Sequence, residues 1–142
     1  MTDLSSSGKG EKMPSEFCPG DIVLVEVFFT NHSGFKLRPA IVVSSLQYNL
    51  HRSDIVVMPI TKQKGSTSRN GAHFGDIILG KSEGTGLNGP IIVKPVPLTI
   101  QKGMIGKKIG SCHKADLSYV LEHLTGNILA QDPQKFRRRT FR

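Results

Sequence analysis

The sequence predicts a mainly β fold: a small barrel or sandwich of short antiparallel strands with one α-helix near the C-terminus. Short apolar runs rich in Val and Ile alternate with turns marked by Gly and Pro, a pattern typical of small barrels. Apolar residues recur with helical spacing in one place, between Leu117 and Leu124. The length of 142 residues and the apolar fraction of 37% suit a single folded domain.

The first three predicted strands are the most apolar. A turn at Pro19 and Gly20 precedes a strand over Ile22–Phe29, where β-branched and aromatic residues predominate. The runs Ala40–Val43 and Ile55–Met58 are apolar at consecutive positions, which indicates strands covered on both faces. Pro59 restricts the third strand because proline cannot donate to a β-ladder, so a bulge or the end of the strand is expected at Pro59–Thr61.

The rest of the chain is expected to form a long loop, shorter strands and the helix. Residues Lys62–Gly75 are polar and basic, and exposed loops of this length are often functional. Short strands are predicted at Asp76–Leu79, Ile91–Lys94 and Met104–Gly110. The helix has an apolar face formed by Leu117, Val120, Leu121 and Leu124, with Ser111 as its expected cap and Gly126 or Pro133 as its expected end.

Charge and composition divide the chain into three parts. Residues 1–16 are polar and are expected to form a disordered leader, 17–131 the folded domain, and 132–142 a basic, disordered tail. The net charge of +8 favours a polyanionic partner: nucleic acid, an acidic protein or an anionic membrane surface. No apolar run approaches the ~20 residues of a membrane-spanning helix, and residues 1–16 lack the apolar core of a signal peptide. We therefore expect a cytoplasmic protein that does not enter membranes.

Several kinds of site are disfavoured. Cys18 and Cys112 lie far apart, so neither a zinc knuckle nor a disulfide framework is expected. The carboxylates are scattered singly, which provides neither a glycosidase pair nor a cluster that would hold a metal cofactor. The five histidines have no spacing that forces two of them together. His32 is the best candidate for acid–base catalysis, because its loop precedes the segment around Arg38.

The segment around Arg38 and the end of the third strand offer the most specific chemistry. Pro39 biases Arg38 toward an extended backbone, which presents a guanidinium suited to binding phosphate. Thr61 follows at the end of the third strand, beside a basic loop. Consecutive strands usually pair, so Arg38 and Thr61 are expected to share one rim of the sheet. A surface arginine and a strand-capping threonine remain the alternative at this point.

An ordered set of short motifs resembles the MazF/PemK family of toxin endoribonucleases. The resemblance runs from Pro19 to about Leu129 and rests on Gly20–Val25, Leu37–Ser45, Val56–Thr61, Gly86-Leu87 with Ile91–Lys94, and Lys108–Gly110. It implies an SH3-like barrel with a C-terminal helix, usually a homodimer, which cuts single-stranded RNA and is neutralised by a labile antitoxin. It also implies that Arg38 and Thr61 are the catalytic pair.

The implied reaction is attack of a ribose 2′-hydroxyl on its own phosphate, without a metal ion. Arg38 would stabilise the charge that develops on the phosphate, and the Thr61 hydroxyl would donate to the same oxygens. His32 is the candidate proton carrier, and the expected RNA contacts are His32, Lys36, Lys62, Lys64 and Arg69. Two prolines within Lys94–Thr99 depart from the family's pattern. A non-catalytic nucleic-acid-binding module, or a topoisomerase poison with the same barrel, is the alternative.

Overall fold

A computed structural model describes residues 16–28, 35–62, 73–80 and 83–130. Its strands are β2 (Asp21–Phe28), β3 (Phe35–Val42), β4 (Asp54–Lys62), β5 (Ile77–Leu79), β6 (Ile91–Val93), β7 (Leu98–Gln101) and β8 (Ile105–Ser111). Its helices are α1 (Leu46–His51), a 3-10 turn (Lys102–Met104), α3 (Lys114–His123) and a π-helical turn (Leu124–Ile128). The predicted leader, the basic tail and most of the predicted long loop lie outside the described residues.

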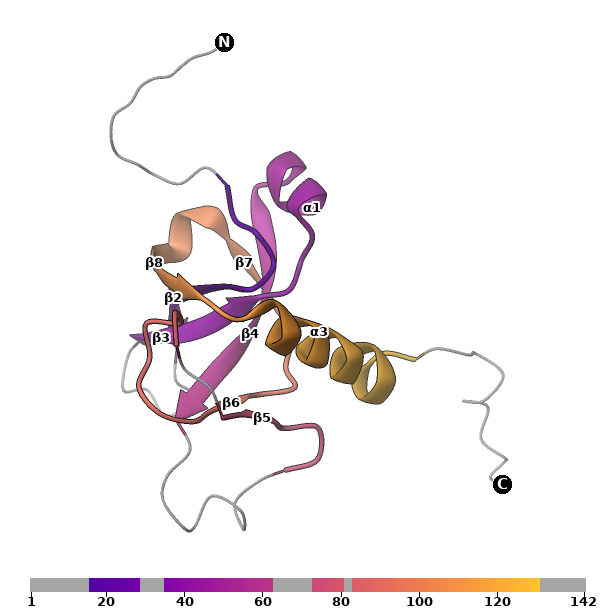
Figure 1. Ribbon diagram of the computed structural model, residues 1–142. Helices are drawn as coiled ribbons and strands as arrows, with labels where there is room; N and C mark the ends of the chain where they lie inside the picture. The colour runs from indigo at the N-terminus through magenta and orange to yellow at the C-terminus, as the bar shows by residue number, and fades with distance from the viewer. Residues whose placement is uncertain (1–15, 29–34, 63–72, 81–82, 131–142) are drawn as a thin grey trace.

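The seven strands form one antiparallel sheet. The strand order is β5-β6-β4-β3-β2-β8, and β7 pairs with the first half of β4. The second half of β4 pairs instead with β6, so this long strand belongs to both parts of the sheet. Figure 1 shows α1 above the strands, and α3 running out to one side above β5 and β6. The predicted fold class, a small β-barrel-type sheet with a C-terminal helix, is confirmed.

Two apolar clusters lie on opposite faces of the central strands, because successive side chains of a strand point to opposite sides. In the first, which we call the helix-side cluster, Val120 of α3 packs with Ile22, Ile41, Met58, Ile60, Ile77, Leu79, Ile91 and Val93. The second, the strand-side cluster, contains Phe17, Val23, Val25, Ala40, Val42, Ile55 and Val57, with Leu98, Ile100 and Ile105 packed against them.

Strands β3 and β4 are both longer than the sequence predicts. Strand β3 begins at Phe35, five positions before Ala40, because its first half pairs with β2. Strand β4 continues through Pro59 and ends at Lys62, one residue after the segment Pro59–Thr61 where its end or a bulge is predicted. Proline lacks a backbone N–H but keeps its carbonyl group. The Pro59 carbonyl accepts a hydrogen bond from the Lys94 amide at 2.8 Å.

Helix α1 was not predicted. Ser45 caps it by accepting a hydrogen bond from the Tyr48 amide at 3.1 Å. The fully buried side chain of Asn49 donates to the carbonyl oxygens of Phe17 at 2.6 Å and Ser44 at 3.1 Å. This buried amide ties the start of the domain to the β3–β4 connection.

Helix α3 has the predicted apolar face but different ends. It begins at Lys114 with His113 as its N-cap, whereas the expected cap, Ser111, is the last residue of β8. The chain continues past Gly126 in a π-helical turn that ends at Ile128, so Gly126 does not stop the helical run. Pro133 lies outside the described residues. Among those residues, no helix is long and apolar enough to cross a membrane.

Candidate active site

Arg38 lies inside β3. The sequence pattern instead places it just before a strand that begins at Ala40. Arg38 is paired with Val25 of β2 and is partly buried. By alternation along β3, its side chain is on the face of Ala40 and Val42, which belong to the strand-side cluster. The guanidinium therefore lies at the border of the apolar core, where its charge acts through a lower effective dielectric than in bulk water.

Thr61 is the next-to-last residue of β4. It is paired with Ile92 of β6 and is partly buried. Ile55 and Val57 of the same strand belong to the strand-side cluster, so alternation puts Thr61 on that face as well. Arg38 and Thr61 thus project from the same face of the sheet.

The register of β3 and β4 relates these two residues further. Ala40 is paired with Pro59 and Val42 with Val57. The pairing of β3 with β4 ends at Ala40 and Pro59, and beyond this point β4 pairs with β6; Arg38 and Thr61 each lie two residues past the last β3–β4 pair. A guanidinium and a hydroxyl in such an arrangement can both donate hydrogen bonds to one anion.

The other predicted RNA contacts are only partly described. Lys36 is exposed and, two residues before Arg38 on β3, lies on the same face. Lys62 is the last residue of β4, and its side chain is outside the described part. The structure does not describe His32, Lys64 or Arg69. Within the described residues, no three His, Cys, Asp or Glu side chains are close enough to hold a metal ion.

Sequence reasoning missed an ion pair beside this face. The Lys94 ammonium lies 2.9 Å from Oδ2 of Asp76, which also accepts the backbone amide of His73 at 2.9 Å. The Asp76 side chain is 2% exposed. Its burial alone would raise the pKa of Asp76, but the His73 amide and Lys94 outweigh it, so the pKa lies below its ordinary value. The pairing depends on strand register, which sequence spacing does not reveal.

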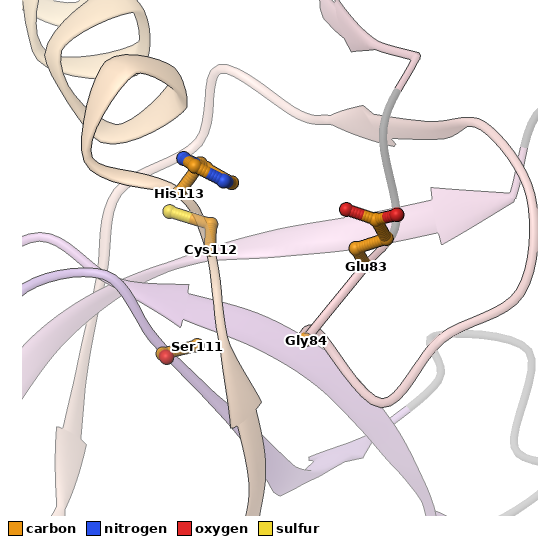
Figure 2. A pocket seen from close by; sticks show the side chains of 5 residues that line it. All are labelled: Glu83, Gly84, Ser111, Cys112 and His113. Atoms are coloured by element: carbon orange, nitrogen blue, oxygen red, sulfur yellow. The ribbon is translucent and has the colours of Figure 1, made fainter.

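An open pocket of about 340 Å³ lies elsewhere, where β8 leads into α3. Figure 2 shows Cys112 and His113 on one side of it and Glu83 on the other. Burial, with a smaller contribution from Asp116, raises the pKa of Cys112 to about 11. The thiol is therefore protonated at neutral pH and is not a ready nucleophile. The pocket includes neither Arg38 nor Thr61.

The fold and the polar groups on its strand-side face define a small β-barrel-type protein with a candidate anion site. A family model described as "PemK-like, MazF-like toxin of type II toxin-antitoxin system" matches residues 19–127. The chain therefore belongs to this toxin family. No curated protein sequence matches it significantly.

Solved structures agree in fold. An endoribonuclease from a mycobacterial species aligns with a TM-score of 0.58 and 18% identity, covering 81% of this chain and 92% of its own. The MazE–MazF complex from Deinococcus radiodurans gives a TM-score of 0.58 and 16% identity, covering 75% and 90%. The toxin MazF-mt6 from Mycobacterium tuberculosis gives 0.52 and 20%, covering 74% and 93%. At these identities the likeness establishes the architecture alone.

Proposed function

We propose that this toxin is an endoribonuclease that cleaves single-stranded RNA without a metal ion. The 2′-oxygen of a ribose forms a bond to the adjacent phosphorus, and the bond from phosphorus to the 5′-oxygen of the next nucleotide breaks. The 2′-hydroxyl loses its proton and the departing 5′-oxygen gains one. The products are a 2′,3′-cyclic phosphate and a 5′-hydroxyl.

The observation that carries the proposal is that alternation along β3 and β4 places Arg38 and Thr61 on one face, each two residues past the last β3–β4 pair. A phosphate between them would receive hydrogen bonds from the guanidinium and the hydroxyl while negative charge builds up on its oxygens. Donors fixed in advance on a sheet lower the barrier because they need no reorganisation during the reaction. An arginine stays protonated and is a poor general base, so we assign Arg38 to charge stabilisation and propose His32 as the proton carrier.

Positive charge would guide single-stranded RNA to this site. Lys36 lies on the face of Arg38, and we propose that Lys62, Lys64 and Arg69 continue the basic track along the segment after β4. Contacts of this kind bind phosphates without reading base sequence.

We further propose that the protein acts in the cytoplasm as a homodimer and that an acidic antitoxin restrains it by covering the Arg38 face. Two relatives of the same fold are described as toxin–antitoxin complexes, one mycobacterial and one from Deinococcus radiodurans. The exposed apolar side chain of Ile78 would supply contact area for such a partner, because its neighbours Ile77 and Leu79 belong to the helix-side cluster and alternation turns Ile78 to the other face. An antitoxin that binds only residues 132–142 and leaves cleavage unchanged contradicts this proposal.

Incubation of the purified protein with end-labelled RNA in EDTA tests the activity. We expect fragments ending in a cyclic phosphate, and we expect them to disappear with Arg38→Ala. Lys114→Ala is the matched control, because Lys114 is an exposed cation at the start of α3, which packs on the helix-side cluster. Intact RNA across many sequences would favour the non-catalytic alternative, a nucleic-acid-binding or topoisomerase-poisoning module.

A further inference from the structure

The ion pair between Lys94 and Asp76 lies on the same sheet face as Arg38 and Thr61. Thr61 is paired with Ile92 and Ile60 with Val93, so Lys94, the first residue after β6, lies next to Pro59. The hydrogen bond from the Lys94 amide to the Pro59 carbonyl agrees with this register. Val93 belongs to the helix-side cluster, and alternation therefore turns Lys94 to the other face, with Thr61.

Lys94 is a diagonal neighbour of Thr61 across the β4–β6 pair, because it lies two residues after Ile92, the partner of Thr61. Residues related diagonally across an antiparallel pair lie about 7–8 Å apart, within the reach of long side chains. The Lys94 side chain is 28% exposed, so its ammonium is not sealed in the core. An ammonium has three donors, and the contact with Asp76 accounts for one of them.

The Asp76 carboxylate is almost fully buried, although the lysine that pairs with it, Lys94, is partly exposed. Its side chain is 2% exposed, and Oδ1 is buried without a hydrogen-bond partner among the described residues. Burying a carboxylate is costly unless it is paired. Because Oδ2 also accepts the His73 amide, the carboxylate is fixed in place and in turn holds the flexible lysine side chain in one direction.

We propose that Lys94 is a further phosphate-binding residue of this face, contacting a phosphate beside the one that is cleaved, and that Asp76 is its positioning residue. The inference rests on the proposed function, since it assumes that single-stranded RNA crosses this face. It adds a contact directly after β6 to the track formed by Lys36 and Arg38 on β3. A purely structural ion pair, which only fastens β5 to β6, is the competing explanation.

Binding of an uncleavable strand separates the two explanations. The probe is a short mixed-sequence RNA with 2′-O-methyl groups throughout, which has no nucleophile, and its affinity is measured by fluorescence anisotropy at several salt concentrations. The loss of one phosphate contact lowers the slope of log affinity against log salt by about 0.7 for a single strand. We expect this change with Lys94→Gln and none with Lys114→Gln, the exposed control on α3.

A second pair of variants tests the role of Asp76. If Asp76 acts through Lys94, Asp76→Asn changes the salt slope or the affinity in the wild-type background but changes neither in the Lys94→Gln background. Thermal unfolding of each variant shows that it is folded. A structural pair would shift the melting temperature and leave the salt slope unchanged, which would overturn the inference while RNA cleavage by the wild type still stands. A wild-type protein that neither binds nor cleaves RNA would instead refute the proposed function.

Discussion

Gly86 packs directly against the backbone of Ile109. Its φ of +82° lies in the left-handed region, and a Cβ atom at this position would overlap the Ile109 carbonyl oxygen. Nearby, the Ser111 amide donates to the Gly84 carbonyl at 2.8 Å. The connection between β5 and β6 is therefore held against β8.

Gly86→Ala is expected to destabilise the protein more than Gly89→Ala. Gly89 also has a positive φ, +74°, but a Cβ there would meet open space. Both substitutions lose about 1–2 kcal/mol from the left-handed backbone, and Gly86→Ala loses about 1–3 kcal/mol more from the overlap. Chemical denaturation of the two variants gives the difference directly. Equal destabilisation would show that the close approach of Gly86 to Ile109 contributes nothing.

The pH dependence of stability reports on Asp76. Its pKa in the folded protein lies below the ordinary 3.8, so the folded state binds this proton less tightly than the unfolded state. The ionised carboxylate therefore adds stability above about pH 4, and this contribution disappears as the pH falls through the lowered pKa. We expect Asp76→Asn to cost about 1.5–3 kcal/mol at pH 7 and progressively less as the pH falls below 4.

The control for this measurement is Glu122→Gln, which removes an exposed carboxylate of α3. It should change the free energy of unfolding little at any pH. A cost of Asp76→Asn that is the same at pH 3 and pH 7 would show that the charge of Asp76 is not what stabilises the β5–β6 end of the sheet.

Cys112 is expected to react slowly with thiol reagents. Burial raises its pKa to about 11, so the reactive thiolate is scarce at pH 8. In a Cys18→Ala background, where Cys112 is the remaining cysteine, the rate of alkylation should keep rising with pH up to about 11. Cys112→Ala should leave RNA cleavage unchanged. An alkylation rate that levels off below pH 9 would contradict the assignment of a neutral, buried thiol.

Local pattern was enough to predict most of the sheet and the one amphipathic helix. The consecutive apolar residues of β4 and the helical spacing of Leu117 and Val120 identify elements whose burial depends on their own side chains. By contrast, α1 has six residues and depends on the Ser45 cap and on Asn49, whose partner Phe17 is distant in sequence. Strand β7 was missed because Pro95 and Pro97 precede it and its pairing with β4 is long-range.

In the candidate site too, some residues can be predicted from local sequence and others cannot. The Arg-Pro pair and the strand-ending threonine can be read from adjacent residues, and so Arg38 and Thr61 were predicted from sequence and family resemblance. Lys94 and Asp76 are 18 positions apart and meet because β5 and β6 pair in one register. A contact created by register is visible only once the strands are aligned.

The central claim is that Arg38 and Thr61 act on one phosphate, and a double-mutant cycle measures this most directly. The values of kcat/KM for RNA cleavage are compared for Arg38→Ala, Thr61→Val, the double variant and the wild type. Each single substitution should slow cleavage by about 10²–10³-fold, and the double variant should be far faster than the product of the two losses predicts, as for groups that act as a unit. Losses that multiply independently, or full activity without Arg38, would contradict a shared site.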